Sequence, residues 1–332
     1  MSARTLFIAL GCVSLSVLIA ACFLGSTPMS PGRIMAALLG QGTNADTLIV
    51  WSIRLPRALA AFVVGTALGI SGAALQGLLR NPLAEPGVLG VSASASLGAT
   101  FVIYYGLASL SPWAVPFAAI AGALAATTLI AIAALKTQAV VTLILIGVGL
   151  SSFAGAAMSL LMNLAPNPFS LSDLINWMLG TVANRSFVDL GFAAPFLLLG
   201  LTILIASRRG LSALTLGDEA AQGVGLDLRR QRIAVVLGAG LLSGAAVSIA
   251  GAIGFVGIIA PHIVRPWVDY DPARTLVPAG LLAGIILVTA DIAVRLAPTS
   301  NELKLGVVAA LIGAPAFVWI AAARRSQGGG DA

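Results

Sequence analysis

Ten stretches of the sequence are each long and apolar enough to cross a lipid bilayer, and short polar segments separate them. About 20 apolar residues at about 1.5 Å per residue span a hydrocarbon core of about 30 Å. Of the 332 residues, 59% are hydrophobic and only 9% are charged, so a soluble fold could not cover its core with polar groups. The sequence therefore predicts an all-α polytopic membrane protein with ten transmembrane helices, in a single domain over residues 1–332. The predicted helices run over 6–24, 58–79, 88–107, 113–135, 140–163, 191–206, 233–250, 253–267, 277–296 and 305–323.

The distribution of basic residues predicts the orientation of these helices. If the N-terminus is cytoplasmic and the helices alternate, two-thirds of the 18 Lys and Arg residues lie on the cytoplasmic side. This excess agrees with the positive-inside rule, so we expect a multi-pass protein of the cell inner membrane with cytoplasmic N- and C-termini. The basic residues are scattered among the polar segments, which argues against nucleic-acid binding. Residues 326–332 are expected to form a disordered C-terminal tail.

The sequence has no ATPase motif and no typical metal site. A phosphate-binding loop needs a lysine directly after a glycine, but Lys136 and Lys304 are the only lysines and neither follows one. One histidine and two cysteines are too few for the usual zinc site. We therefore expect a permease without enzymatic activity and without a cofactor of its own. If ATP drives it, another chain must bind ATP and Mg²⁺ and hydrolyse the nucleotide.

Three polar segments are long enough to have functions of their own. Residues 25–57 and 164–190 are expected outside the membrane, and residues 207–232 in the cytoplasm. In the cytoplasmic segment, residues 218–222 can form a short helix, because its acidic residues stand at the favourable N-terminal end and glycines follow it. Such a helix is either a plain connection or a knob that seats in a partner protein.

Several motifs occur in order along nearly the whole chain: Arg54-Leu55-Pro56-Arg57, Asn81-Pro82-Leu83-Ala84-Glu85-Pro86-Gly87, Leu216-Gly217-Asp218-Glu219, Gly251-Ala252-Ile253-Gly254-Phe255-Val256-Gly257 and Leu311-Ile312-Gly313-Ala314-Pro315. In sequence and spacing they resemble the permease subunits of ABC importers for ferric siderophores, haem and vitamin B12. The resemblance implies the inverted-repeat fold of type II importers, with ten transmembrane helices per subunit. It also implies a homodimer, two ATP-binding subunits and a periplasmic substrate-binding protein. A ferric siderophore is the expected substrate, with haem or cobalamin as alternatives.

The resemblance also implies that three arginines at the outer ends of the helices, Arg54, Arg57 and Arg295, receive acidic side chains of the binding protein. Arginines that face outward suit this role because a guanidinium group can bind a carboxylate through two hydrogen bonds. The alternative is that they anchor helix ends at the membrane surface. Asp291 lies four residues before Arg295, so the two can form an intramembrane ion pair on one helix face.

The cytoplasmic segment is the expected site of coupling to the ATPase, through Leu214, Leu216, Gly217, Asp218, Glu219, Gly223 and Leu226. Its apolar residues are expected to seat in a groove of the ATP-binding subunit, with Asp218 and Glu219 at the rim. The resemblance also implies a translocation pathway along the fifth helix, with Gly147, Ser151, Gly155 and Met158 on its wall and an inner gate at Val140, Val141 and Thr142. An ion-coupled secondary transporter is the alternative class, and it is disfavoured because Asp291 is nearly the only carboxylate predicted within a span.

Overall fold

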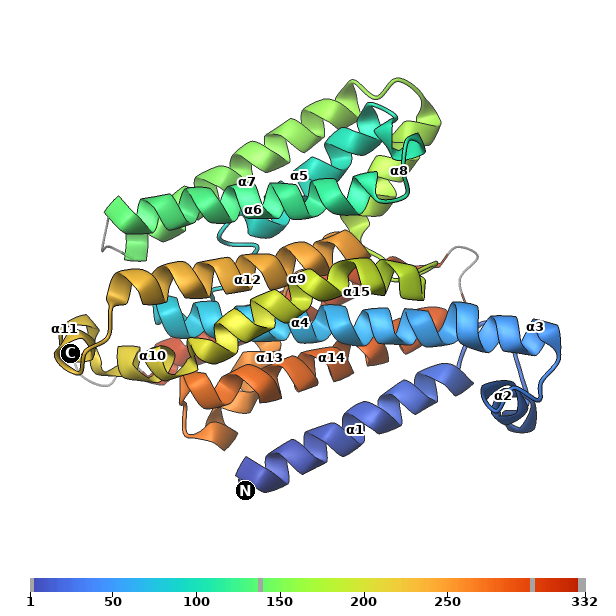
Figure 1. Ribbon diagram of the computed structural model, residues 1–332, viewed down its shortest axis with the longest axis horizontal. Helices are drawn as coiled ribbons and strands as arrows, with labels where there is room; N and C mark the ends of the chain where they lie inside the picture. The colour runs from blue at the N-terminus through green and yellow to red at the C-terminus, as the bar shows by residue number, and fades with distance from the viewer. Residues whose placement is uncertain (1–2, 137–139, 299–301, 328–332) are drawn as a thin grey trace.

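The structure is a computed structural model that describes residues 3–136, 140–298 and 302–327, and no strand occurs among these residues (Figure 1). The predicted all-α class is confirmed. The first half contains α1 (Ala3–Phe23), α2 (Pro31–Leu38), α3 (Asn44–Thr47), the π-helical η1 (Leu48–Arg54), α4 (Leu55–Leu79), α5 (Val91–Tyr104), the short η2 (Leu107–Ser109), α6 (Ala114–Lys136) and α7 (Val140–Asn163). The second half contains α8 (Pro168–Leu179), α9 (Phe187–Ala206), α10 (Arg208–Ala213), η3 (Leu214–Leu216), α11 (Asp218–Gly223), α12 (Leu228–Ala250), α13 (Val256–Val264), η4 (Arg265–Val268), α14 (Pro272–Leu296) and α15 (Leu305–Gln327).

Seven helical segments in the described part of the chain are long and apolar enough to span a membrane. They are α1, the continuous segment from α3 to α4, α6, α7, α9, α12 and α14. Three shorter apolar helices, α5, α13 with η4, and α15 as far as Val318, correspond to the other predicted spans. The prediction of a full-length third span is wrong, because α5 has 14 residues, about 21 Å. The eighth span, predicted as the short segment 253–267, is shorter still, since α13 has 9 residues, about 14 Å.

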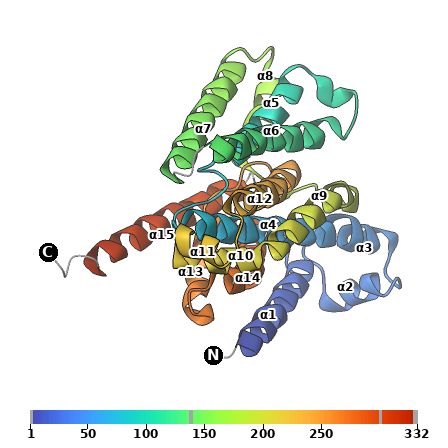
Figure 2. The ribbon, with the colours of Figure 1, turned by 60° about the vertical axis from the view of Figure 1, so that its left-hand side comes forward.

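The helices are arranged in an elongated bundle. In Figure 1, α5, α6 and α7 form the upper group, α12, α9, α4 and α14 lie in the middle, and α1 lies along the lower edge. The short helices α10 and α11 lie at the left end, whereas α2 and α3 lie at the right end. Figure 2 shows α15 projecting away from the bundle at its C-terminal end. This helix runs to Gln327, so the first two residues of the predicted tail are helical, and residues 328–332 lie outside the described part of the chain.

Helix α4 is the centre of the bundle. It packs against α14, α12 and α13, and most of its residues are buried. Glycines permit the close approach: a Cβ on Gly65 would lie 2.8 Å from the Cα of Gly284 on α14. A Cβ on Gly72 would lie 2.0 Å from the carbonyl oxygen of Gly257 on α13. Small residues at such helix crossings allow the two backbones to come into van der Waals contact, which stabilises helix packing in membranes.

The two short helices α5 and α13 begin inside the bundle, halfway along their neighbours. In the first turn of α13, a Cβ on Gly257 would lie 2.9 Å from the carbonyl oxygen of Leu68, in the middle of α4. The segment before α5 reaches the middle of α7, where the Ser151 hydroxyl donates to the carbonyl of Gly87 at 3.0 Å. Non-helical backbone is stable in the middle of a membrane protein only where other parts of the protein shield it from lipid, as they do at these two breaks.

The short helices also reveal the predicted inverted repeat. Each follows a long helix, α5 after α4 and α13 after α12. The end of α4 and the start of α12 lie at the same end of the bundle, since Arg80 and Arg232 both pair with Asp218. The two long helices therefore run in opposite directions, and each is followed by a break and a half-length helix, which is the pattern of inverted repeats in transporters.

Glu85 links the two breaks. Its Oε2 accepts a hydrogen bond from the backbone N–H of Phe255, the residue that caps the N-terminus of α13, at 3.2 Å. Phe255 has a positive φ of 66°, a conformation that costs a bulky residue energy and that surrounding contacts must enforce. The expectation that Asp291 is nearly the only carboxylate within the spans is therefore incomplete, because Glu85 also lies inside the bundle.

Candidate coupling and docking sites

The predicted coupling segment forms a compact unit between α9 and α12, made of α10, η3 and α11 (Figure 1). Gly217 separates η3 from α11 and has a φ of 101°, in the region that L side chains rarely adopt. Gly225, after α11, has a φ of 88°. These two glycines allow the chain to turn on each side of α11, as the sequence pattern predicts.

Side-chain contacts fix the coupling segment to three long helices of the same chain. Asp218 pairs with Arg80 at the end of α4, and with Arg232 on α12 at 2.7 Å. The hydroxyl of Ser212 donates to Asp271, the N-cap residue of α14, at 2.6 Å. The segment is therefore attached to α4 and α12 through α11, and to α14 through α10.

These contacts change the roles assigned to the segment's residues. Asp218 was expected at the rim of a partner's groove, but its carboxylate faces two arginines of its own chain. Leu214 was expected to seat in the partner, but it is only 2% exposed and belongs to the core of this chain. Leu226 is half-buried against the same core. The exposed apolar side chains are Leu216 at 65% and Val224, which directly follows Gly223, at 69%.

The exposed residues on either side of α11 and Glu219 within it therefore form a small knob. Leu216 and Val224 are its apolar parts, and the exposed Glu219 lies between them in sequence. Large apolar side chains exposed next to charged ones at the end of a membrane protein are typical of a surface that a partner covers.

Arginine side chains cover the C-terminal end of α1. Arg54 donates to the carbonyls of Cys22 at 2.9 Å and Phe23 at 3.1 Å. Arg295 donates to the carbonyls of Ala21 at 3.0 Å and Leu24 at 3.1 Å. The last carbonyls of a helix have no partner within the helix, and cations are favourable there, so both arginines stabilise this helix end.

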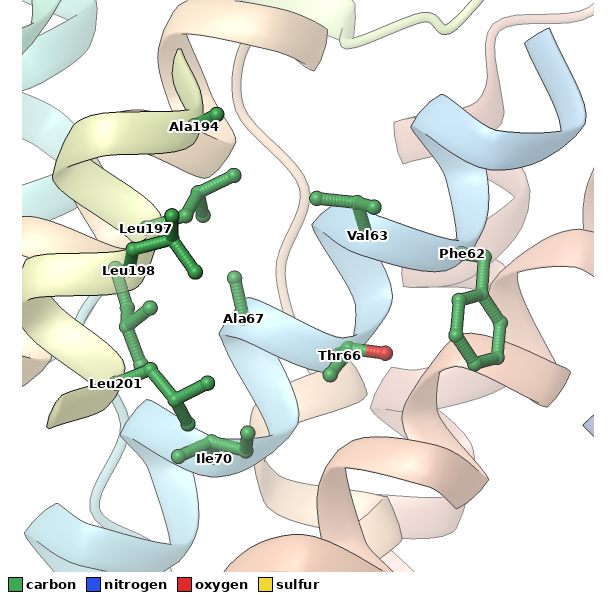
Figure 3. A pocket seen from close by; sticks show the side chains of 10 residues that line it. Phe62, Val63, Thr66, Ala67, Ile70, Ala194, Leu197, Leu198 and Leu201 are labelled. Atoms are coloured by element: carbon green, nitrogen blue, oxygen red, sulfur yellow. The ribbon is translucent and has the colours of Figure 1, made fainter. Parts of the chain in front are cut away.

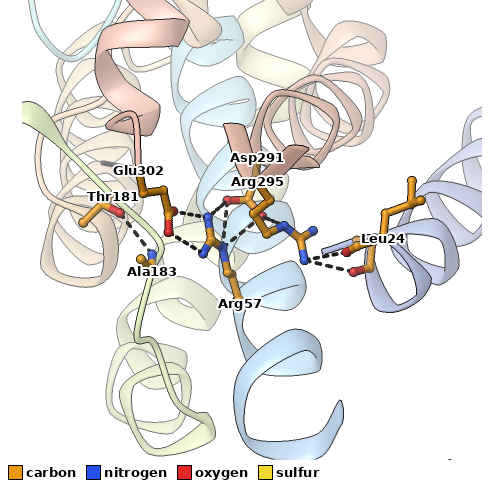
Figure 4. Close-up of polar contacts among 8 residues, drawn as sticks. Leu24, Arg57, Thr181, Ala183, Asp291, Arg295 and Glu302 are labelled. Atoms are coloured by element: carbon orange, nitrogen blue, oxygen red, sulfur yellow. Dashed lines mark hydrogen bonds and ion pairs between the residues drawn. The ribbon is translucent and has the colours of Figure 1, made fainter. Parts of the chain in front are cut away.

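A charge cluster lies beside this helix end (Figure 4). Arg57 donates two hydrogen bonds to Oδ1 of Asp291, at 2.9 and 2.7 Å, and it also pairs with Glu302. The predicted ion pair between Asp291 and Arg295 is present, with Nε 3.1 Å from Oδ2. Asp291 is fully buried, whereas the side chain of Glu302 is 41% exposed. The strongest partner of Asp291 is thus Arg57, 234 positions away in sequence, which helical spacing could not indicate.

The geometry corrects the expectation that the three outer arginines project outward. Arg54, Arg57 and Arg295 are buried, and each is held by carbonyls or carboxylates of its own chain. Two of them act as helix-end anchors, the alternative that the sequence analysis left open. Only Arg57 has a partner at the surface, Glu302, so docking through arginine stays a prediction for this one position.

The predicted pathway residues lie mostly on the packed side of α7. Gly147 and Met158 are buried, and Ser151 bonds to the segment before α5. A Cβ on Gly147 would lie 2.6 Å from the Cα of Leu89. Gly147, Ser151 and Met158 thus contribute to packing within this chain, and their place on a pathway wall stays a prediction. On Gly155, in contrast, a Cβ would meet no atom within 4 Å.

The predicted gate lies at the start of α7. Val140 begins this helix, Val141 is 66% exposed and Thr142 is half-buried. Residues 137–139, where α6 turns into α7, lie outside the described part of the chain. The exposed side of α7, which includes Val141, is the side that a second subunit or a pathway can use.

An apolar groove of about 300 Å³ lies between α4 and α9 (Figure 3). Leu197, Leu198 and Leu201 of α9 form one wall, and Val63 and Ala67 of α4 form the other. Apart from the hydroxyl of Thr66, which Figure 3 shows pointing away from the leucines, the lining side chains are hydrocarbon. Such a groove has no group to recognise a polar cargo, and it is typical of a surface covered by lipid chains.

The chain resembles known transport proteins over nearly its whole length. A model of the FecCD transport family matches residues 12–323. An uncharacterized ABC transporter permease protein of Bacillus subtilis, YvrB, is 38% identical over 296 residues, covering 88% of this chain and 83% of its own. The vitamin B12 import system permease protein BtuC of Citrobacter koseri is 39% identical over 82% of each chain. A solved metal-chelate type ABC transporter in an inward-facing conformation matches with a TM-score of 0.83 and 27% identity, over 96% of this chain and 99% of its own.

Proposed function

Because the chain belongs to the FecCD transport family and is a multi-pass permease subunit of an ABC importer, we propose that it carries a metal chelate into the cytoplasm. In this proposal two copies form the pathway, two separate ATP-binding subunits hydrolyse ATP, and a periplasmic binding protein delivers the substrate. The observation that carries the proposal is the coupling segment, with an exposed knob on one side and ion pairs to α4 and α12 on the other. Such a unit can receive a push from a partner and pass it to the spanning helices.

The proposed orientation places α10 and α11 in the cytoplasm. The excess of Lys and Arg on that side supports it, and the N- and C-termini then lie on the same side. The outer face then carries α2, α3 and α8, together with the cluster of Arg57, Asp291 and Glu302.

The proposed cargo is a large metal chelate, with cobalamin placed before a ferric siderophore. A relative with 39% identity is named as a vitamin B12 permease, which supports cobalamin. The solved neighbour is named as a metal-chelate transporter, which suits either compound. Haem is the third candidate, and the residues of this chain do not discriminate among the three.

The proposed docking of the binding protein centres on Arg57. A carboxylate of the binding protein would take the place of Glu302, whose side chain reaches the surface, while Asp291 keeps its two arginines. Exchange of one carboxylate for another preserves the charge balance of the cluster, so it costs less than exposure of an unpaired arginine.

The test is uptake by proteoliposomes that hold the permease and its ATP-binding subunits, with the purified binding protein outside. Cobalamin, a ferric siderophore and haem are each supplied in labelled form, with and without ATP. We expect ATP-dependent accumulation of one of them. Uptake driven by a proton gradient without ATP-binding subunits would refute the proposal and support a secondary transporter.

The role of the coupling segment is tested in the same vesicles with Asp218→Asn. This change weakens the attachment of α11 to Arg80 and Arg232 but leaves the exposed knob in place. We expect ATP hydrolysis to continue while uptake per ATP falls. The neighbouring Glu219→Gln is the matched control, because Glu219 is exposed and its loss leaves both ion pairs intact.

A further inference from the structure

A second groove, of about 680 Å³, lies where α1, the junction of α9 and α10, and the start of α14 meet. Its apolar part is formed by Phe7 of α1, Ile205 of α9 and Val277 of α14. These residues belong to three spanning helices and lie near their ends on the side of the coupling segment. The groove therefore opens at the boundary between the hydrocarbon region and the headgroups.

The polar part of the groove carries an excess of positive charge. Arg208, Arg209 and Arg274 line it, and Asp271 is the acidic residue among the lining side chains. Asp271 is already engaged, because it accepts from Ser212 and lies 3.6 Å from Arg274. Arg274 also pairs with Asp269 at 3.3 Å, outside the lining.

Arg208 and Arg209 supply the remaining charge. Both are exposed, and neither has an ion-pair partner among the residues that the structure describes. They begin α10 directly after the last turn of α9, so they stand where the apolar wall ends. Two adjacent free guanidinium groups above an apolar wall match a phosphate group attached to acyl chains, because arginine binds phosphate oxygens and the wall accepts the chains.

We propose that this groove binds one anionic phospholipid of the cytoplasmic leaflet. Its phosphate lies between Arg208 and Arg209, and an acyl chain lies along Phe7, Ile205 and Val277. Because Arg208 and Arg209 belong to the coupling segment, the bound lipid joins this segment to α1 and α14. The inference uses the proposed orientation of the chain but requires neither a particular cargo nor the ATP-binding subunits.

The test is lipid binding to the purified full-length permease in detergent, measured by native mass spectrometry. Phosphatidylglycerol and phosphatidylcholine are titrated against the wild type, the double variant Arg208→Gln/Arg209→Gln and the control Arg229→Gln/Arg230→Gln. The control removes another adjacent pair of exposed arginines from the same side of the chain and lies outside the groove. Each arginine near a lipid headgroup contributes about fivefold in affinity, so we expect the first double variant to bind phosphatidylglycerol about 25-fold more weakly and the control to match the wild type.

Two further arms identify the ligand. Phe7→Ala is expected to weaken binding of phosphatidylglycerol, and inorganic phosphate is expected not to displace the lipid. Displacement by phosphate together with no effect of Phe7→Ala would show a site for free anions and would overturn the proposal. Equal losses of phosphatidylglycerol affinity in the two double variants would show unspecific attraction by surface charge and would refute the proposal. Equal affinity of the wild type for phosphatidylglycerol and phosphatidylcholine would also refute the proposal. An unchanged affinity of the Arg208→Gln/Arg209→Gln variant for lipid, with weaker capture of the ATP-binding subunit, would assign the groove to that partner.

Discussion

Replacement of Leu216 by alanine tests whether the coupling knob works as an apolar anchor. The side chain of Leu216 is 65% exposed in the isolated chain, so a partner that covers it removes most of its surface from water. Full burial of a leucine side chain is worth about 1.5–3 kcal/mol, and the exposed share therefore corresponds to about 1–2 kcal/mol. Since about 1.4 kcal/mol is a tenfold change in affinity, we expect Leu216→Ala to weaken binding of each ATP-binding subunit about 5- to 30-fold.

The control is the same change two residues earlier. Leu214 is 2% exposed and packs inside its own chain, so Leu214→Ala leaves a cavity in the permease. A buried leucine truncated to alanine typically costs about 2–5 kcal/mol of folding stability. We therefore expect Leu214→Ala to lower the thermal unfolding temperature of the permease, and Leu216→Ala to leave that temperature unchanged.

The assay is the equilibrium binding of a fluorescent ATP-binding subunit to the permease in detergent, with the unfolding temperature measured on the same preparations. We predict that Leu216→Ala lowers the affinity for the ATP-binding subunit and leaves the unfolding temperature unchanged. If Leu216→Ala binds the subunit as tightly as the wild type, the exposed knob is not the anchor. If Leu216→Ala lowers the unfolding temperature as much as Leu214→Ala does, Leu216 contributes to the fold and the division between the two leucines is wrong.

Two further predictions concern the fold. Asp291→Asn leaves two buried arginines without their full countercharge, so we expect it to lower the free energy of unfolding by about 3–5 kcal/mol. Glu302→Gln changes a partly exposed carboxylate and should lower it by no more than about 1 kcal/mol. Chemical denaturation in micelles measures both changes. Gly72→Ala places a Cβ 2.0 Å from the carbonyl oxygen of Gly257 and should destabilise the permease by about 1–3 kcal/mol. Gly149→Ala, where a Cβ would meet no atom within 4 Å, is its control, and a similar drop in unfolding temperature for both would contradict the packing argument.

The sequence predicts the helical class, most span positions and the short glycine-bounded helix at 218–223, because apolar length and glycine position are local properties. It does not predict which side of α7 is packed, since the helix is apolar all around and the half-buried Ser151 bonds to the segment before α5. It also misses the pairing of Arg57 with Asp291, because nothing local joins residues so distant in sequence. The eighth span is already predicted as a short segment, 253–267, which carries Pro261. The shortness of α5 could have been anticipated in the same way, because the turn before it, with Pro82 and Pro86, is the kind of interruption that marks broken helices.

The half-length of α5 and α13 has a consequence for how the chain is made. With 14 and 9 residues, neither helix reaches the length at which a segment enters a bilayer as an independent span. Glu85 and the open backbone around it are also unfavourable in lipid until Phe255 and the neighbouring helices cover them. We therefore expect the two segments to enter the membrane only together with the long helices that precede them. Because Glu85 and Phe255 are 170 positions apart, the break before α5 stays incomplete until most of the chain has been synthesised.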